Sequence, residues 1–191
     1  MRKFLSVVFI WSVAFSFAQN VSQSVIINYI EEYSHLAIIE MYRYKIPASI
    51  TLAQAILESY AGTSDLAKNA NNHFGIKCHV GWDGMNYIKT DDEEQECFRK
   101  YFTVEESYRD HTLFLWSRPR YGKLFLLPIY DYKLWCYGLK ETGYATLPEY
   151  AEKLIKIIEK YHLDELDHFW IYDTEEEALS MLKIKLQQKR G

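Results

Sequence analysis

The chain of 191 residues has little glycine, proline or cysteine, with 8, 4 and 3 copies, and it has no excess of positive charge. Few glycines and prolines, together with 49% hydrophobic residues, exclude a collagen-like repeat and a disordered chain. The mixture of charges excludes a protein with many membrane spans. A net charge of −4 argues against a nucleic-acid partner, because phosphate contacts need a concentrated basic face. The composition is therefore that of a globular domain.

Several catalytic and metal-binding motifs are also missing. The chain has no G-x-S-x-G sequence and no glycine-rich phosphate loop, and no pair of its histidines has helical i, i+4 spacing with a supporting carboxylate. We therefore expect neither a metal site nor an organic cofactor.

The first 18 residues have the features of a secretory signal. Arg2 and Lys3 precede an almost entirely apolar run over residues 4–17, and small residues precede a cleavage point after Ala18. The run is short for a membrane span, and no cysteine near the cleavage point marks lipid attachment. We expect export to the periplasm, cell envelope or exterior, with no transmembrane segment after cleavage. An uncleaved anchor or a buried first helix is the alternative.

Helical patterns dominate both ends of the chain. Apolar residues spaced by three and four follow Ser22 and Ser24, which predicts a helix over residues 22–44. A second helix should begin near Pro47 and end before Gly62, and Ser64 can cap a short third one.

Two later segments have the spacing of a helical capping box. Thr103 precedes Glu106, and Thr146 precedes Glu149, in each case ahead of an apolar helical pattern. A last helix is expected after residue 173, with three glutamates in its first turn and lysines near its end, as the helix dipole favours. We expect that helix to dock on the domain; contact with a partner or the cell wall is the alternative.

Residues 74–102 lose the helical period. Turn residues separate short runs at 85–88 and 97–101, which predicts a small β-hairpin lobe over a helical body, with a cleft between the two lobes. Cys78 and Cys97 flank this segment and could form a disulfide, although three buried thiols are the alternative. Cys136 lies in an apolar helical pattern and should be a small core residue. The fold class is therefore α+β and predominantly helical, in one monomeric domain.

Glu58 is the only charged residue in the second predicted helix. Desolvation and the negative end of the helix dipole should both disfavour its anion and raise its pKa. A raised carboxyl pKa suits a general acid near neutral pH. A solvent-facing glutamate at a helix end is the competing interpretation.

Several segments together resemble the glucosaminidase domain of glycoside hydrolase family 73, a group of mannosyl-glycoprotein endo-β-N-acetylglucosaminidase-like peptidoglycan hydrolases. These segments follow one another in the family's order, from residue 46 to about residue 161. They are IPASITLAQAILESYAGTSDLA (46–67), NNHFGIKC (71–78), GWDG (81–84), DDEEQECFRKY (91–101), SYRDH (107–111), RPRY (118–121) and GYATLPEYAEKLIKII (143–158).

The resemblance implies a lysozyme-like two-lobed fold and cleavage of the N-acetylglucosaminyl β-1,4 bond in peptidoglycan glycan strands. It also implies a catalytic glutamate, which falls on Glu58. We expect a signal peptide (1–18), an N-terminal helix packed on the domain (19–45), the glucosaminidase domain (46–166) and a C-terminal helical extension (167–191).

Glycoside hydrolysis normally requires a second carboxylate. The family's second acidic residue lies before the strand that leads into its FR-x-Y element, so the candidates here are Asp91 first and Asp92 as the alternative, acting as a base on water. A solvated hairpin turn is an equal interpretation of this acidic stretch, and a substrate-assisted route would need no base.

Sugar rings pack on aromatic faces, and two aromatic residues at family motif positions, Phe74 and Tyr144, are the favoured candidates for this contact. Core packing is the commoner role of any single aromatic residue, and a turn role is the simpler one for an asparagine. The remaining substrate-binding candidates are Tyr121, Trp82, Tyr87 and Asn72.

Tyr60 departs from the family pattern, which usually has glycine two residues after the catalytic glutamate. A phenol at this position could fill part of the cleft or cover Glu58. We therefore keep a non-catalytic glycan-binding protein of the same fold as an alternative to a glucosaminidase. A lytic transglycosylase is a second alternative, because such enzymes share a lysozyme-like body with one catalytic glutamate.

Overall fold

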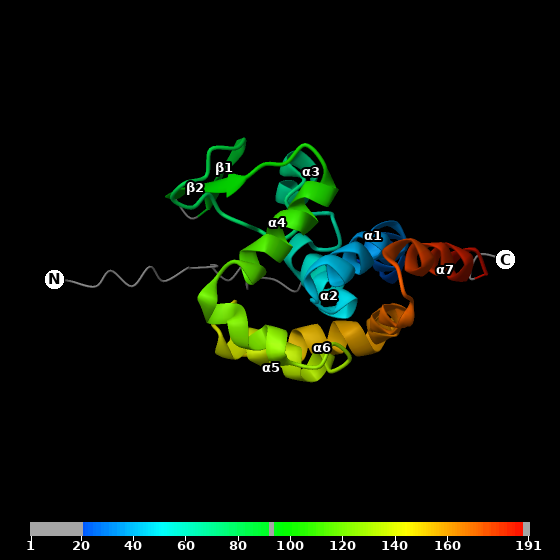
Figure 1. Ribbon diagram of the computed structural model, residues 1–191. Coiled ribbons are helices and arrows are strands. Elements are labelled where there is room, and N and C mark those ends of the chain that lie inside the picture. The colour runs from blue at the N-terminus through cyan, green and yellow to red at the C-terminus, as the bar shows by residue number, and fades with distance from the viewer. Residues whose placement is uncertain (1–20, 92–93, 189–191) are drawn as a thin grey trace.

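The computed structural model describes residues 21–91 and 94–188, which form a mostly helical body beside one two-stranded antiparallel hairpin (Figure 1). This architecture confirms the expected α+β, predominantly helical fold. In chain order the elements are α1 (Gln23–Tyr44), α2 (Ala48–Ser59), α3 (Asp65–Ala70), β1 (Asn86–Asp91), β2 (Glu94–Arg99), α4 (Val104–Trp116), the 3-10 helix η1 (Pro119–Leu126), α5 (Tyr132–Glu141), α6 (Tyr150–Tyr161), the 3-10 helix η2 (Leu163–Ile171) and α7 (Glu175–Gln188).

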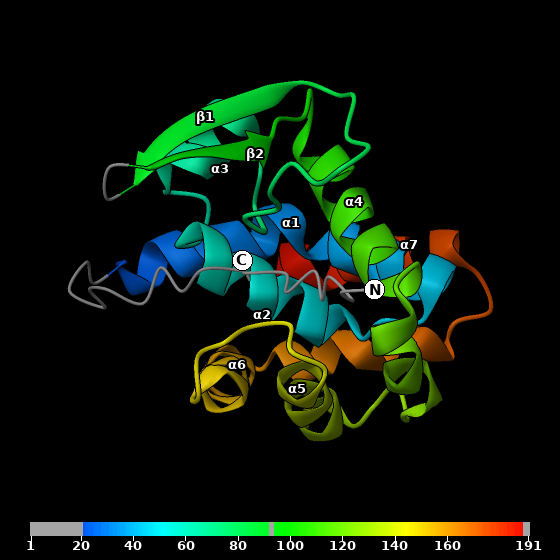
Figure 2. The same cartoon turned by 90° about the vertical axis from the view of Figure 1, so that its left-hand side faces the viewer.

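Helix α2 lies at the centre of the body, with α1 on one side and the α5–α6 pair on the other (Figure 2). All of its 12 residues except Leu57 and Glu58 are buried. A helix that is apolar all round is stable only when it is enclosed by other elements. The near absence of charge in this segment therefore explains its central position.

Most of the predicted helix starts are confirmed. The hydroxyls of Ser22, Ser64 and Thr103 accept hydrogen bonds from the backbone N–H three residues later and so cap α1, α3 and α4. The capping box expected at Thr146 is wrong: α6 begins at Tyr150, and its N-cap, Glu149, makes no side-chain capping bond.

The hairpin pairs β1 with β2 so that Ile88 faces Cys97 across the ladder. Both strands are displaced by a few residues from the expected runs at 85–88 and 97–101. Cys78 forms a disulfide with Cys97, 19 residues later, which ties the segment before the hairpin to β2. The third cysteine, Cys136, is a free, buried thiol in α5.

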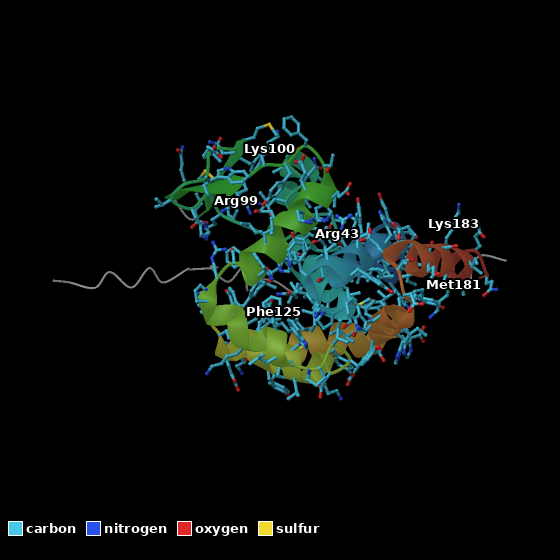
Figure 3. All side chains as sticks on the ribbon, in the orientation of Figure 1. Arg43, Arg99, Lys100, Phe125, Met181 and Lys183 are labelled. Carbon is cyan, nitrogen blue, oxygen red and sulfur yellow. A yellow bond between two sulfur atoms is a disulfide. The ribbon has the colours of Figure 1, made fainter. Side chains whose placement is uncertain are left out.

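The C-terminal helix packs on the body, as the docking interpretation predicts. Ala178 and Leu182 of α7 are buried, and Arg43 of α1 forms an ion pair with Glu175 at 3.1 Å. Lys183 of the same helix lies at the end of the molecule away from the hairpin (Figure 3).

The start of α2 is held by Asp167, the residue where we expected the C-terminal extension to begin. Its carboxylate accepts hydrogen bonds from the backbone N–H of Ser49 at 2.8 Å and from the Ser49 hydroxyl at 2.6 Å. An amide in the first turn of a helix has no partner within the helix, so this contact satisfies a donor that would otherwise be buried unpaired. The segment η2 is thus part of the support of the central helix.

Within residues 21–91 and 94–188, no helix combines the length and the hydrophobicity that crossing a membrane would require. The proposed signal segment, residues 1–18, lies outside the described residues.

Candidate active site

Glu58 lies in the last turn of α2, where the central helix reaches the surface of the body. Its side chain is partly buried, and desolvation raises the pKa of the carboxyl from 4.5 to about 7. The hydrogen bond from Tyr150 and the positive charge of Lys153 lower this pKa without cancelling the effect of burial. The carboxyl group is therefore substantially protonated near neutral pH.

Two buried side chains orient this carboxyl group. The hydroxyl of Tyr150, at the start of α6, donates a hydrogen bond to Oε1 of Glu58 at 3.0 Å. Nε2 of Gln54, one turn earlier in α2, donates to the Tyr150 hydroxyl at 3.0 Å. The hydrogen bond to Oε1 fixes the rotation of the carboxyl group about its bond to the chain.

Tyr60 occupies the C-cap of α2 in the left-handed conformation, with φ of 52°. Glycine is the usual residue at such a position because a side chain is strained there, which gives a structural reason for the glycine that the family usually has. Burial and the negative charge of Glu58 both raise the pKa of Tyr60.

A pocket of about 290 Å³ extends from this end of α2. Apolar side chains of α1 and α2, among them Ile26 and Leu57, line it together with Tyr60. On the α6 side it is lined by Lys153, Lys156 and Lys160. Tyr60 therefore forms one wall of this pocket, and Glu58 is not among the residues that line it.

Four of the six predicted sugar-binding residues are buried and have no face open to a ligand. Phe74 stacks on His111 with ring centroids 3.9 Å apart, and Tyr144 stacks on Tyr150 with centroids 5.6 Å apart. This packing does not support the expectation that the two rings face a sugar, because another ring stacks on each of them. The exposed fractions are 1% for Phe74, 2% for Tyr144, 0% for Tyr121 and 1% for Asn72.

Asn72 has the structural role that an asparagine in a turn commonly has. Its Nδ2 donates to the backbone carbonyls of Ile76 at 2.9 Å and Arg99 at 2.8 Å, and its Oδ1 accepts from the Ile76 amide at 3.1 Å. These bonds connect the segment before the hairpin with β2. The side chain therefore has the turn role that the sequence analysis gave as the simpler interpretation.

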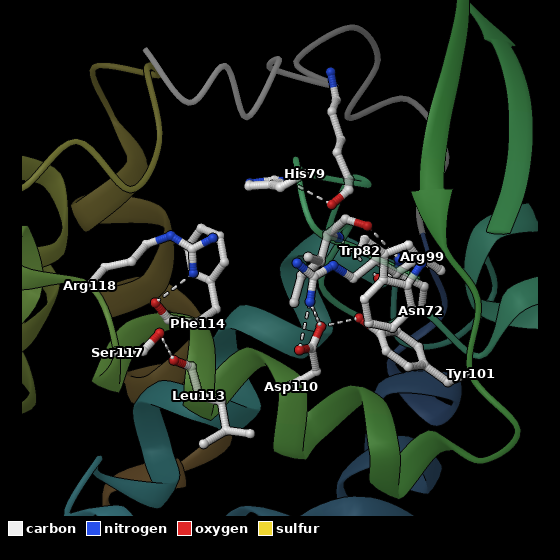
Figure 4. Close-up of polar contacts among 12 residues, drawn as sticks. Asn72, His79, Trp82, Arg99, Tyr101, Asp110, Leu113, Phe114, Ser117 and Arg118 are labelled. Carbon is white, nitrogen blue, oxygen red and sulfur yellow. Dashed lines mark hydrogen bonds and ion pairs between the residues drawn. The ribbon is translucent and has the colours of Figure 1, made fainter. Parts of the chain in front are cut away.

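Trp82 and Tyr87 belong to the hairpin lobe and remain partly exposed. Trp82 covers the guanidinium of Arg99, which lies 4.3 Å from the indole centroid (Figure 4). Arg99 in turn forms two hydrogen bonds to Asp110, at 2.8 and 2.9 Å. The partly exposed ring of Trp82 thus packs on Arg99, which is itself paired with Asp110.

Asp91 is the last residue of β1, where it pairs with Glu94 across the hairpin. This backbone position lies at the tip of the hairpin lobe. Asp92, the alternative base, lies outside the described residues.

Tyr150 is the functional residue that the sequence analysis missed as a partner of Glu58. It fits the apolar period of α6, so its ring is indistinguishable from a core residue by pattern alone, and only 2% of it is exposed. Among the described residues, no group of three or more His, Cys, Asp and Glu side chains is arranged to hold a metal ion.

Comparison with known families gives a match to the glucosaminidase family, described as mannosyl-glycoprotein endo-beta-N-acetylglucosaminidase, over residues 34–163. The exo-glucosaminidase LytG of Bacillus subtilis (strain 168) is 42% identical over 137 residues, which are 65% of this chain and 48% of LytG. Peptidoglycan hydrolase FlgJ of Vibrio cholerae is 30% identical over 137 residues, or 64% of this chain and 39% of FlgJ. The chain thus spans about half the length, or less, of these relatives.

Two solved structures share the fold. A peptidoglycan hydrolase from Sphingomonas sp. A1 superposes with a TM-score of 0.64 and 28% identity, covering 73% of this chain and 91% of that one. The glycoside hydrolase domain of Salmonella typhimurium FlgJ superposes with a TM-score of 0.64 and 25% identity, covering 85% and 98%.

Proposed function

Because the chain belongs to the glucosaminidase family, we propose that it hydrolyses the N-acetylglucosaminyl β-1,4 bond of peptidoglycan glycan strands, with Glu58 as the general acid. The observation that supports this role is a carboxyl group whose pKa is about 7, held by Tyr150 at the surface end of a buried helix. A carboxyl group with an ordinary pKa would already have lost its proton near pH 7.

In this mechanism Glu58 donates its proton to the glycosidic oxygen as the bond to the leaving sugar breaks. Tyr150 acts as a positioning residue, because its hydrogen bond fixes the rotation of the carboxyl group. The same hydrogen bond stabilises the carboxylate that remains after the proton has left.

The second step requires water to attack the anomeric carbon. We propose Asp91, the last residue of β1, as the base that activates this water, with Asp92 as the alternative. A substrate-assisted route, in which the acetamido group of the sugar attacks, would not need either carboxylate.

We also propose that residues 1–18 direct export and are then removed, so that a monomeric domain acts on glycan strands in the periplasm, cell envelope or exterior. Peptidoglycan lies outside the cytoplasmic membrane, so a glycan-cleaving domain must be exported to reach it.

Analysis of product ends on purified peptidoglycan tests the proposed function. Hydrolysis should leave reducing N-acetylglucosamine ends, whereas a lytic transglycosylase would leave anhydro-muramyl ends and a binding protein would leave the strands intact. Glu58→Gln should abolish release while the protein stays folded, as judged by circular dichroism.

A matched control is Glu141→Gln, which removes an exposed carboxylate at the end of α5 and should leave activity unchanged. Wild-type activity in Glu58→Gln would refute the assignment of the acid.

A further inference from the structure

Three arginines, Arg99, Arg118 and Arg120, which we call the arginine cluster, lie where the hairpin lobe meets the end of α4. The pKa of Arg118 is lowered by burial and also by the positive charges of Arg99 and Arg120, so the three groups act on one another. Like charges gathered in a partly desolvated place are costly unless an anion is bound there. The formal charge of the whole chain is negative, which makes this local excess of positive charge distinctive.

Among the described residues, Arg99 has a carboxylate as its ion-pair partner and the other two arginines have none. Asp110 accepts both hydrogen bonds from Arg99 and a third, at 2.5 Å, from the Tyr101 hydroxyl. Within residues 21–91 and 94–188, neither Arg118 nor Arg120 forms an ion pair with a carboxylate. Two positive charges of the cluster are therefore available to a ligand.

The unpaired guanidinium groups are held in fixed positions. Arg118 lies over the ring of Phe114 at 3.6 Å, and its Nη1 donates to the Phe114 carbonyl at 3.1 Å (Figure 4). Arg120 lies over the ring of Tyr121 at 4.5 Å and donates to the hydroxyl of the same residue. Side chains that are already ordered lose little entropy when they bind an anion.

Two donors of the cluster also lack a partner. Nε of Arg99 and Nε of Arg120 are buried, and no described residue accepts a hydrogen bond from either. Buried donors in native proteins are almost always satisfied, so two unsatisfied ones in the same cluster indicate that a bound group or water completes the site.

Figure 4 shows the ends of Arg118 and Arg99 directed toward one another from the two sides of the view, with His79 between and above them. The pKa of His79 is lowered by burial and by the charges of both arginines, which agrees with this placement. The three arginines thus come from two segments, the end of β2 and the chain after α4, and His79 lies beside them from a third.

A row of buried rings connects the cluster to the proposed acid. The ring of Tyr121 lies 6.3 Å from that of Tyr144, which stacks on Tyr150 at 5.6 Å, and Tyr150 binds Glu58. Close-packed interiors are stiff, so the separation between the arginines and Glu58 is fixed by these rings.

Resting on the proposed function, we propose that the arginine cluster binds a carboxylate carried by a muramyl residue of the substrate. Glycan strands alternate neutral N-acetylglucosamine with muramyl residues, whose lactyl group ends in a carboxylate or in an acidic peptide. An anion bound at a fixed separation from Glu58 would place every second glycosidic bond at the acid. The cluster would therefore select the N-acetylglucosaminyl bond over the neighbouring one.

The test measures how fast the full-length exported protein cleaves four substrates. Two are peptide-bearing strands and strands whose peptides were removed by an amidase. The other two are the same strands after their carboxyl groups have been converted to neutral amides. Hydrogen bonds between charged groups contribute enough for about a tenfold effect or more. We expect neutralisation to lower the wild-type kcat/KM at least tenfold, mainly through KM, for the strand type whose carboxylate binds. An effect confined to amidase-treated strands identifies the lactyl carboxylate, and one confined to peptide-bearing strands identifies the peptide.

Arg118→Gln should reproduce the tenfold loss on the carboxylate-bearing strands and change cleavage of the neutral ones less than twofold. Lys183→Gln, which removes one positive charge from α7 on the far side of the molecule, should change neither. If Arg118→Gln does not fold, the proposal is still tested by Arg120→Gln and by the cleavage of charged and neutral strands by the wild type. Equal cleavage of charged and neutral strands by the wild type, or equal losses on both in the variants, would overturn the proposal.

Failure of the proposed function gives a different result, namely no cleavage of any strand by the wild type. Calorimetric titration of the Glu58→Gln protein with the same four strands then tests the cluster separately. We expect at least tenfold weaker binding after neutralisation, and equal or undetectable binding of both forms would overturn the inference.

Discussion

Replacing Tyr150 by phenylalanine should move the pH dependence of activity toward higher pH. The hydroxyl donates to Oε1 of Glu58 at 3.0 Å and lowers the pKa of that carboxyl group by favouring its anion. Without the hydroxyl the anion loses this support, so the carboxyl group should keep its proton to a higher pH. Because a general acid must be protonated, the fall in kcat/KM at alkaline pH should move upward.

The size of the shift follows from the strength of the bond. A hydrogen bond to a charged group contributes about 1.5–3 kcal/mol, which corresponds to roughly 1–2 pKa units. Glu58 is only partly buried, so water can replace some of the lost interaction. We therefore expect the alkaline limb to move from about pH 7 upward by about one unit.

The assay is the pH profile of reducing-end release from purified peptidoglycan. Tyr132→Phe is a matched control, because it removes an exposed tyrosine hydroxyl that donates to Glu159 at 3.3 Å. This control should leave the profile unchanged. An alkaline limb of Tyr150→Phe that stays in place or moves to lower pH would refute the reasoning.

The same variant should also be less stable. Nε2 of Gln54 donates to the Tyr150 hydroxyl and would lose its acceptor in a buried place. A buried donor left without a partner costs about 1–3 kcal/mol. Urea unfolding measures this loss and ensures that the pH profile is recorded on folded protein.

Two further predictions concern stability. Burial raises the pKa of Asp167 from 3.8 to about 7, so the folded chain retains a proton that the unfolded chain releases, and stability should fall as pH rises from 4 to 7. Asp167→Asn should make this fall shallower by up to about 1.4 kcal/mol per pH unit in urea unfolding, and an unchanged slope would contradict the assignment. Replacing Cys78 and Cys97 by serine removes a crosslink between residues 19 apart, for which loop-closure entropy predicts a loss of about 3 kcal/mol. Thermal unfolding with and without reductant measures that loss, and equal wild-type midpoints in the two conditions would disprove it.

The parts of the fold that depend on local sequence could be predicted. The start of α1 at Ser22, the central helix without charge and the loss of helical period before the hairpin each depend on residues close together in the chain. The start of α6 could not be predicted, because the spacing of Thr146 and Glu149 imitates a capping box while the helix begins at Tyr150.

The faces of the aromatic side chains could not be predicted either. A motif position shows that Phe74 or Tyr144 matters to the family, but it does not show whether the ring contacts a sugar or other rings. The covering residues belong to other elements: His111, 37 residues from Phe74, lies in α4, and Tyr150, six residues after Tyr144, opens α6. The packing of separate elements decides this question, and a single sequence contains no direct signal of it.

The pKa of Glu58 likewise has a part that the local sequence predicts and a part that depends on the rest of the fold. The shift of its pKa from 4.5 to about 7 corresponds to roughly 3 kcal/mol. A helix dipole contributes only about 0.3–1 kcal/mol at a terminus, so the position of Glu58 at the end of α2, which the sequence does reveal, accounts for less than one pKa unit. Most of the shift comes from desolvation by elements packed around the end of α2, including α6, whose Tyr150 is 92 residues away in the chain. The sequence of α2 therefore identifies the acid, while the packing of the rest of the fold sets the pH range in which it can act.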